Sequence, residues 1–279
     1  MSSPRLSILA LFLFATLAAR GTAQTVLYRD FTSTTGLTRN SVSVSGGAIT
    51  LADNANDRGS VFTSSTYSIS SFSAAFEFRI TNPGGGTDSF NQQGADGLAF
   101  VIQRAQANAL GSSGEGLGYL GINQSVAVEF DTWFNSTRAD PDSNHYGLDL
   151  NGSVNSVVTA AESTRFDNGQ KWSVWVDYNG TALEVRASTT GVRPTTASLT
   201  YGTAQNPFDL ATAIGGANAY IGFTGATGSA TGTHQLLSFA FSDTYVPGGI
   251  SVIPEPSTYA LFGLGLGLVG VAAWRRRRG

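Results

Sequence analysis

Two carboxylates stand two residues apart in an otherwise apolar stretch of the chain. They are Glu129 and Asp131, in the run VAVEFDTWFN that begins at Val126. Alternate side chains of a strand point to the same face, so on a strand these two carboxylates would share a face, about 7 Å apart. Like charges held so close repel unless a cation lies between them, and a divalent ion balances both at once. The pattern predicts a metal site on a strand.

The polar segment that follows adds further ligands of a suitable kind. Asn135, Asp140 and His145 are expected to return toward the same edge of the sheet. Carboxylate and amide oxygens suit calcium, whereas one imidazole suits a transition ion such as manganese. Each residue alone is more often a solvated or structural side chain, but the combination favours a metal site. An EF-hand is rejected, because His145 stands where that loop needs glycine and no helices flank it.

The composition excludes several other kinds of site. The 279 residues include no cysteine and two histidines, which rules out disulfide scaffolds, thiolate zinc sites and multi-histidine zinc sites. The second histidine, His234, is interpreted as structural. Residues 24–253 carry ten basic and eighteen acidic side chains, a formal charge of −8. That sign is wrong for binding a phosphate backbone, so cations and not nucleic acids are the expected partners.

Strand-like runs, separated by glycine, asparagine and aspartate, recur through the middle of the chain. In Trp172–Tyr178 alternate side chains are apolar, and Asn179-Gly180 then predicts a tight hairpin. Helical periodicity is nearly absent, so we expect an all-β sandwich or jelly roll of antiparallel sheets. The predicted strands are 72–80, 97–103, 126–132, 145–150, 172–178, 182–188, 219–224 and 236–242.

Residues 1–23 have the layout of a secretory signal peptide. A short polar start with Arg5 precedes an apolar run from Leu6 to Ala19, and small residues follow at 21–23. A buried core helix is the alternative, but the run adjoins the initiator methionine and is followed at once by strand-like sequence. The mature protein is therefore expected to begin near Gln24 and to be exported.

The C-terminal end has three parts in a fixed order: Pro254-Glu255-Pro256, an uncharged run over 258–274, and an arginine-rich tail over 275–279. The run would form a helix of about 26 Å, at the short end of what can span a bilayer, with the arginines on the cytoplasmic side. This order resembles the PEP-CTERM sorting signal of Gram-negative bacteria. The resemblance implies recognition and cleavage by a membrane sorting protease of the exosortase type; a permanent membrane anchor is the alternative.

The central region resembles the legume-type (L-type) lectins. The resemblance rests on VAVEFDTWFN, HYGLDLN and ADGLAFVIQ, and on AYIGFTGATG and HQLLSFAF near the C-terminal end. It implies a concanavalin A-like jelly roll over 24–246, followed by a linker over 247–257. It also implies two cations. A transition ion such as Mn²⁺ would be held by Glu129, Asp131, Asp140 and His145, and Ca²⁺ by Asp131, Asp140, Asn135 and the carbonyl of Trp133.

The same resemblance implies a carbohydrate site. Asp96, after a cis Ala95–Asp96 peptide bond, would accept hydrogen bonds from sugar hydroxyls, and Trp133 would cover the apolar face of the ring. The remaining contacts would come from Asn135, from the backbone of Gly118 or else Gly116, and from the loop Gly228, Ser229 and Ala230. Glycans or exopolysaccharide are the expected ligands, at the cell surface or in the extracellular matrix of a Gram-negative bacterium after transient attachment to the inner membrane.

Two other functions fit parts of the sequence. A glycoside hydrolase on the same fold would need a third carboxylate after Glu129 and Asp131, but Trp133 and Phe134 occupy both positions where it would fall. A matrix module whose metals serve stability alone would keep the metal ligands and bind no sugar. We therefore expect a lectin and not an enzyme.

Overall fold

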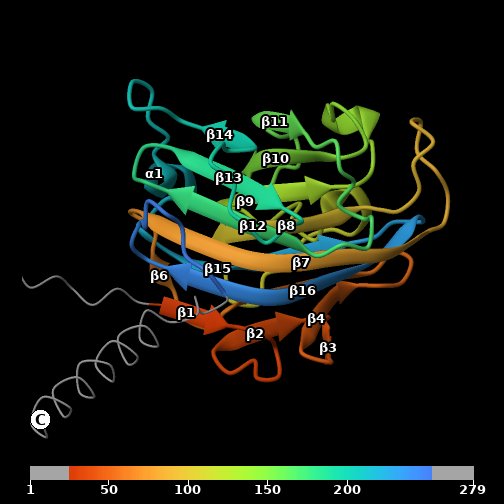
Figure 1. Cartoon of the computed structure of the whole chain (residues 1–279), viewed down its shortest axis with the longest axis horizontal. Helices are drawn as coiled ribbons and strands as arrows, with labels where there is room; N and C mark the ends of the chain where they lie inside the picture. The colour runs from red at the N-terminus through yellow and green to blue at the C-terminus, as the bar shows by residue number, and fades with distance from the viewer. Residues whose placement is uncertain (1–24, 253–279) are drawn as a thin grey trace, which may run out of the picture.

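The computed structural model describes residues 25–252, and two antiparallel sheets packed face to face hold almost all of their regular secondary structure (Figure 1). The predicted all-β sandwich is confirmed. No helix within this range is long and apolar enough to cross a membrane. The predicted signal peptide and C-terminal helix lie outside the described residues.

The first sheet has eight strands. Seven follow one another in the order β14-β13-β12-β7-β16-β4-β3, and β1 pairs with part of β16. The strands are β1 (Thr25–Tyr28), β3 (Ser43–Ser45), β4 (Ala48–Ala52), β7 (Phe72–Gly84), β12 (Trp172–Tyr178), β13 (Leu183–Ser188), β14 (Leu199–Tyr201) and β16 (Thr231–Ser242).

The second sheet also has eight strands, in the order β11-β10-β9-β8-β15-β5-β2, with β6 paired to β15. The strands are β2 (Leu37–Asn40), β5 (Arg58–Thr63), β6 (Tyr67–Ser68), β8 (Gly97–Gln103), β9 (Ser125–Asp131), β10 (His145–Leu150), β11 (Val158–Ala161) and β15 (Asn218–Ala226). One short helix, α1 (Leu210–Ile214), and two 3-10 turns, η1 (Gly114–Gly116) and η2 (Ser136–Arg138), complete the described elements.

Alternation along the strands decides which side chains fill the space between the sheets. On β9, Val128 and Phe130 face the main core, whereas Glu129 between them does not. On the opposing sheet, Phe76 contributes to the same core and its ring centroid lies 4.8 Å from that of Phe223. Burying a side chain of this size stabilises the fold by about 2–3 kcal/mol. The core therefore fixes the register that turns the carboxylates of β9 outward.

The turn between β12 and β13 is longer than the sequence predicts. Tyr178 pairs with Leu183, which leaves a four-residue loop closed by a hydrogen bond from the backbone N–H of Asn179 to the carbonyl of Ala182 (3.2 Å). The side chain of Asn179 accepts hydrogen bonds from the N–H groups of Thr181 and Ala182, and Gly180 has a positive φ. The asparagine thus shapes the turn through its side chain instead of adopting a left-handed backbone.

A C-terminal strap, residues 245–252, lies across the outer face of the first sheet. Its backbone is held at Val246, whose N–H donates to Ser73 Oγ (3.0 Å), and at Ile250, whose carbonyl accepts from Trp175 Nε1 (3.0 Å). Val252 packs in a small apolar cluster with Trp175 and residues 75 and 240. The sequence placed the end of the domain at 246, but packed chain continues to 252.

His234 is buried without a partner. The side chain on β16 is 0% exposed, and neither ring nitrogen has a hydrogen-bond partner among residues 25–252. Burial, opposed only by Asp57, lowers the pKa of His234 to about 4. The unfolded chain takes up this proton at higher pH than the native state. The contribution of His234 to stability is therefore complete above pH 6.5 and is lost as the pH falls toward 4.

We expect His234→Phe to remove this acid sensitivity. An apolar ring of similar shape leaves no buried nitrogen unpaired and does not titrate. Thermal melting at pH 5 and pH 8 measures the effect. The variant should exceed the wild type by several degrees in Tm at pH 5 and by less at pH 8; a variant that is less stable at both pH values would mean that the imidazole is bonded in the native state.

Candidate functional site

The paired carboxylates lie on the outer face of β9, between β8 and β10. In the antiparallel register Asp131 is opposite His145 and Glu129 is opposite Gly147, so all four residues share one face. Glu129 is 2% exposed and Asp131 is 4% exposed. Two carboxylates are therefore buried side by side, as the spacing predicted.

Gly147 gives Glu129 its space. A Cβ atom at position 147 would lie 2.1 Å from Glu129 Oε1 and 2.1 Å from Ser156 Oγ, closer than any real contact. The backbone of β10 can approach the carboxylate only because no side chain stands there. Gly147 lies in the HYGLDLN motif, but no role for it could be predicted from the sequence.

We expect Gly147→Ala to damage the metal site more than the fold. The added methyl group must displace the carboxylate of Glu129, and overpacking of this kind costs about 1–3 kcal/mol. Isothermal titration with Mn²⁺ should show affinity lowered by at least about tenfold, since the change affects a ligand directly. Gly169→Ala is the control for general destabilisation: the position has open space around it, and its positive φ makes alanine cost about 1–2 kcal/mol there. Unchanged Mn²⁺ affinity would mean that Glu129 is no ligand.

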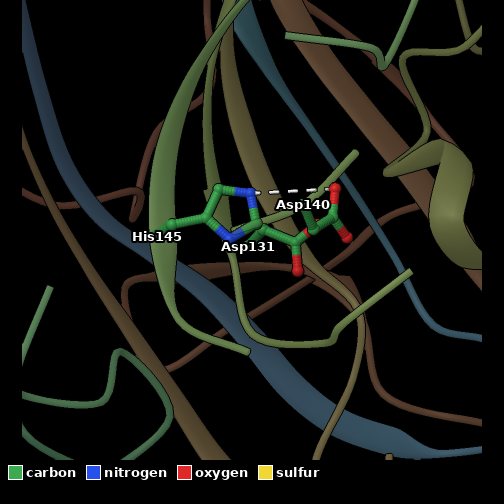
Figure 2. Close-up of side chains that lie close together, drawn as sticks. All are labelled: Asp131, Asp140 and His145. Carbon is green, nitrogen blue, oxygen red and sulfur yellow. Dashed lines mark ion pairs between the residues drawn. The ribbon is translucent and has the colours of Figure 1, made fainter. Parts of the chain in front are cut away.

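Asp140 and His145 approach the carboxylates of β9 from the loop and from β10. Ligand atoms of Asp131, Asp140 and His145 all lie within 4.8 Å of one another (Figure 2). His145 Nε2 is 3.6 Å from Glu129 Oε1 and 3.9 Å from Asp140 Oδ1. The structure thus brings together the four residues predicted to hold a transition ion.

The side chain of His145 is fully buried and makes no hydrogen bond to any described residue. It is 0% exposed, and both ring nitrogens lack a partner within 25–252. Burial lowers the pKa of His145, but the neighbouring carboxylates Glu129, Asp140 and Asp142 outweigh it, so the net shift is upward. A buried imidazole nitrogen facing carboxylate oxygens at more than hydrogen-bond distance is the arrangement expected of a metal ligand.

Burial of several carboxylates in one place shifts their protonation. Burial, followed by the charges of Glu129 and Asp140, raises the pKa of Asp131 well above its usual value. Burial also raises the pKa of Asp140 to about 6, although the N–H of Asn135 opposes the shift. A site of this kind is unfavourable while its carboxylates are charged and unbalanced, and a cation removes that penalty.

Asp149 and Ser156 extend the cluster beyond the predicted residues. Ser156 Oγ lies 2.7 Å from Glu129 Oε1 and 2.8 Å from Asp149 Oδ1, and Asp149 is 0% exposed. Burial, then Glu129, raises the pKa of Asp149 well above its usual value. Ser156 thus orients Oε1 of Glu129, and Asp149 holds Ser156 in place. Alternation on the strand could have identified Asp149, four residues after His145, whereas nothing in the sequence indicates Ser156.

The loop after β9 is tied to the same carboxylates through its backbone. The N–H of Trp133 donates to Asp131 Oδ1 (2.6 Å), and the N–H of Asn135 donates to Asp140 Oδ2 (2.7 Å). The side chains of Trp133 and Asn135 are half-buried. The two residues predicted for both calcium and sugar binding therefore lie at the rim of the cluster, positioned by it.

Asp96 lies next to this rim. The Ala95–Asp96 peptide bond is cis, and the carbonyl of Asp96 accepts hydrogen bonds from the N–H (2.9 Å) and hydroxyl (3.1 Å) of Thr132. Its side chain is 4% exposed, and Oδ2 has no partner among the described residues. Burial raises the pKa of Asp96 to about 7, an effect that the backbone N–H of Gly228 opposes. A buried carboxylate with a free oxygen is a ready acceptor for a hydroxyl.

The glycine loop differs from the expectation. The N–H of Gly118 donates to the carbonyl of Ser112 (2.8 Å), and the N–H of Gly116 donates to Ser113 (3.2 Å), so neither amide is free for a ligand. Gly118 is buried and has a positive φ, and a Cβ there would meet Gly225 O at 3.0 Å. Its role is to let the loop pack closely on β15.

The last predicted loop separates into an exposed and a buried part. Gly228 lies over Asp96, since a Cβ atom added at Gly228 would be 3.3 Å from Asp96 Oδ2. Ser229 is exposed. Ala230 is 2% exposed, and its Cα lies close beneath Gly85. Ser229 is therefore available to a ligand, whereas Gly228 is half-buried and Ala230 supports the loop.

An ion pair that the sequence did not indicate joins two of these loops. Arg138 of η2 contacts the carboxylate of Glu115 in η1, and both side chains are partly exposed. Glu115 also contributes to raising the pKa of Asp96, after burial. The pair connects the loop above the metal ligands to the loop beside Gly228.

These features define a class of protein: an antiparallel jelly roll with a buried carboxylate–imidazole cluster on the outer face of one sheet. Next to the cluster is a second polar site, here called the cradle, which consists of Asp96, Trp133, Asn135 and Ser229. Residues 23–252 match the legume lectin domain, and residues 252–278 match the PEP-CTERM protein-sorting motif. The chain belongs to the legume lectin domain family.

Individual relatives agree with that family. A seed lectin beta chain of Spatholobus parviflorus is 32% identical over 199 residues, 65% of this chain and 74% of its own. An L-type lectin-domain containing receptor kinase VIII.1 of Arabidopsis thaliana is 33% identical over 188 residues, which is 64% of this chain; the chain spans only 24% of that relative's length. The fold resembles that of a Bauhinia forficata lectin in complex with GalNAc, with a TM-score of 0.65 at 24% identity over 80% of this chain and 99% of that one.

Family membership decides between a lectin and a glycoside hydrolase. The lectin prediction is confirmed at the level of the family, which is one of carbohydrate-binding proteins and not of enzymes. The hydrolase alternative also lacks its third carboxylate, since Trp133 and Phe134 occupy the relevant positions after β9.

Proposed function

We propose that this protein is an exported lectin that binds a pyranose sugar in the cradle around Asp96, in a manner that depends on bound cations. The observation that carries the proposal is the buried Asp96 carboxylate, whose Oδ2 has no partner among the described residues and lies under Gly228, next to the exposed Ser229. Asp96 would accept hydrogen bonds from two sugar hydroxyls, while Trp133 would cover the apolar C–H face of the ring. The Asn135 side chain would complete the polar contacts.

The donor set fits two cations of different kinds. Four of the buried groups, including the partnerless imidazole of His145, suit a transition ion such as manganese. Oxygen donors suit calcium, and Asp131 and Asp140 would be shared between the two ions. The proposed transition-ion ligands are Glu129, Asp131, Asp140 and His145; the proposed calcium ligands are Asp131, Asp140, Asn135 and the carbonyl of Trp133. When bound, the ions would neutralise the carboxylates.

The cations and the sugar would be linked through the backbone after β9. Asp131 and Asp140 already accept the N–H groups of Trp133 and Asn135, so whatever fixes these carboxylates also fixes the two rim residues. Ordering the rim before the sugar arrives lowers the entropic cost of binding. Metal binding would therefore act on the sugar site by positioning, without contact between ion and sugar.

The terminal segments would direct the protein out of the cell. The match of residues 252–278 to the PEP-CTERM sorting motif indicates sorting to the cell surface. The finer steps are part of the proposal: a signal peptide over 1–23, transient attachment through 258–274, and cleavage by an exosortase-like protease. The final location would be the cell surface or exopolysaccharide matrix of a Gram-negative bacterium.

A panel of sugars with and without chelator tests the proposal. Purified residues 24–252 would be titrated with galactose, N-acetylgalactosamine, mannose and glucose, with disaccharides built from each, and on a glycan array. We expect binding of at least one sugar at about millimolar Kd, lost in EDTA and restored by Ca²⁺ and Mn²⁺. Metal-dependent stability without any saccharide binding would instead identify a structural matrix module.

A further inference from the structure

Phe90 is a solvent-exposed aromatic side chain. It is 50% exposed and is the one exposed aromatic among residues 25–252. Its ring packs edge-to-face on Phe134, with 4.9 Å between centroids. Phe134 directly follows Trp133, the proposed stacking residue, so the aromatic pair adjoins the rim of the cradle.

A single carboxylate holds both aromatic residues in place. Asp88 Oδ1 accepts hydrogen bonds from the N–H groups of Phe90 and Gln92 (2.9 Å each), and Oδ2 accepts from the N–H of Phe134 (3.2 Å). Burial opposes the shift, but the polar groups around the carboxylate, Ser143 among them, lower the pKa of Asp88. The charged carboxylate therefore fixes two segments that lie more than forty positions apart in the chain.

The loop that carries Phe90 is ordered at its base as well. Thr87 and Gln93 form a β-bridge, and Gln93 Nε2 donates to the carbonyl of Gly85 (3.1 Å). Gly85 packs directly against Ala230, since a Cβ atom added at Gly85 would lie 2.6 Å from the Cα of Ala230. The loop thus runs from the Ser229–Ala230 turn on one side of the cradle to Phe134 on the other. An exposed apolar ring held by this many contacts is preorganised.

We propose that Phe90 and Phe134 form a second subsite, which binds the next pyranose ring of an oligosaccharide whose first ring occupies the cradle. The inference rests on the proposed function. The occupant is a sugar because the subsite is continuous with the saccharide cradle, and because it combines one aromatic surface with polar neighbours. A pyranose ring, with an apolar C–H face and polar edges, matches that surface.

The test compares monosaccharides with longer sugars. For the monosaccharide that the wild type binds from the panel of galactose, N-acetylgalactosamine, mannose and glucose, its disaccharides and trisaccharides should bind more tightly. Phe90→Ala should lower oligosaccharide affinity by about three- to tenfold, with less than a twofold change for the monosaccharide. Phe90→Trp should retain the gain. Leu27→Ala, a change at another exposed apolar residue, on β1, is the control and should alter neither affinity.

A second variant acts through the anchor of the loop. Asp88→Asn keeps the size of the side chain but has one acceptor oxygen in place of two, so it should also reduce the oligosaccharide gain. The inference is overturned if Phe90→Ala leaves the ratio of oligosaccharide to monosaccharide affinity unchanged, or lowers both affinities equally. Absence of any saccharide binding by the wild type would refute the proposed function instead.

Discussion

Asp96→Asn should reduce sugar affinity by about a hundredfold or more, beyond detection for a millimolar ligand. The carboxylate can accept hydrogen bonds from two hydroxyls, each worth about 1.5–3 kcal/mol when the acceptor is charged. Asparagine keeps one acceptor oxygen and turns an N–H₂ group toward a site that needs an acceptor. Calorimetric titration with the tightest sugar of the panel measures the loss.

The same substitution should leave the fold intact. Burial raises the pKa of Asp96 to about 7, which means that its charge is costly in the native state, so a neutral side chain of equal size should not lower Tm. Asp177→Asn is the matched control on the opposite sheet. Asp177 is 1% exposed and accepts a hydrogen bond from Ser73 (2.6 Å), so that change should lower Tm and spare sugar binding. Loss of Tm and sugar binding together in Asp96→Asn would make Asp96 a structural residue.

His145→Ala should abolish transition-ion binding and weaken sugar binding together. Removal of the imidazole leaves Glu129, Asp131 and Asp140 without the one nitrogen donor of the cluster, and structural metal sites lose most of their affinity when a ligand is removed. Sugar affinity should fall by at least about tenfold, because the backbone N–H groups of Trp133 and Asn135 are held by the same carboxylates. Titrations with Mn²⁺ and with sugar, in the same preparations, measure both effects. His234→Ala is the control, as a buried histidine outside the cluster.

The pH dependence of the metal-free protein should have the opposite sign to that of metal binding. Burial raises the pKa of Asp140 to about 6 and that of Asp131 well above its ordinary value. The native state therefore holds these protons more tightly than the unfolded chain, and their contribution to stability is complete below pH 4 and is lost as the pH rises through 6. Metal binding must release the same protons, so Mn²⁺ affinity should rise between pH 5 and pH 7.

Melting curves at several pH values, with EDTA or with both ions, check this behaviour. The stabilisation by the ions should grow as the pH rises from 5 to 7. A shift in Tm that is the same at every pH would mean that the ions bind elsewhere. A loss of Mn²⁺ binding in His145→Ala without any change in sugar affinity would separate the two sites and contradict the proposed coupling.

Every strand that the sequence predicted has a buried face. Trp172–Tyr178, His145–Leu150 and Gly97–Gln103 have the predicted bounds, because alternating or continuous apolar residues mark a strand that packs on the core. Seven strands were not predicted: β2, β3, β4, β5, β6, β11 and β14. Most are short or partly exposed, although β4 and β5 are largely buried. Ser43–Ser45, for example, has an exposed serine on each side of a half-buried valine, so its pairing depends on β4 and not on its own composition.

Some residues of the site could also be predicted from the sequence and others could not. Glu129 and Asp131 could be predicted as a pair because strand periodicity fixes their common face, and register then brings His145 beside them. The contributions of Ser156 and Asp88 could not be predicted, because a loop places each against a residue distant in sequence. The occupied amide of Gly118 is of the same kind: its partner, Ser112, is set by the path of the loop and not by the glycine pattern.

The strap over the first sheet has a consequence for how the domain is presented. It ends on the side of the sandwich opposite to the cluster of β9 and β10, since Trp175 and Val252 lie outside one sheet and Glu129 and Asp131 outside the other. If the domain is attached through the residues that follow 252, the outer face of the first sheet is the one that faces the attachment point. The face that carries the proposed saccharide site would then point outward, toward polymers in the surrounding medium.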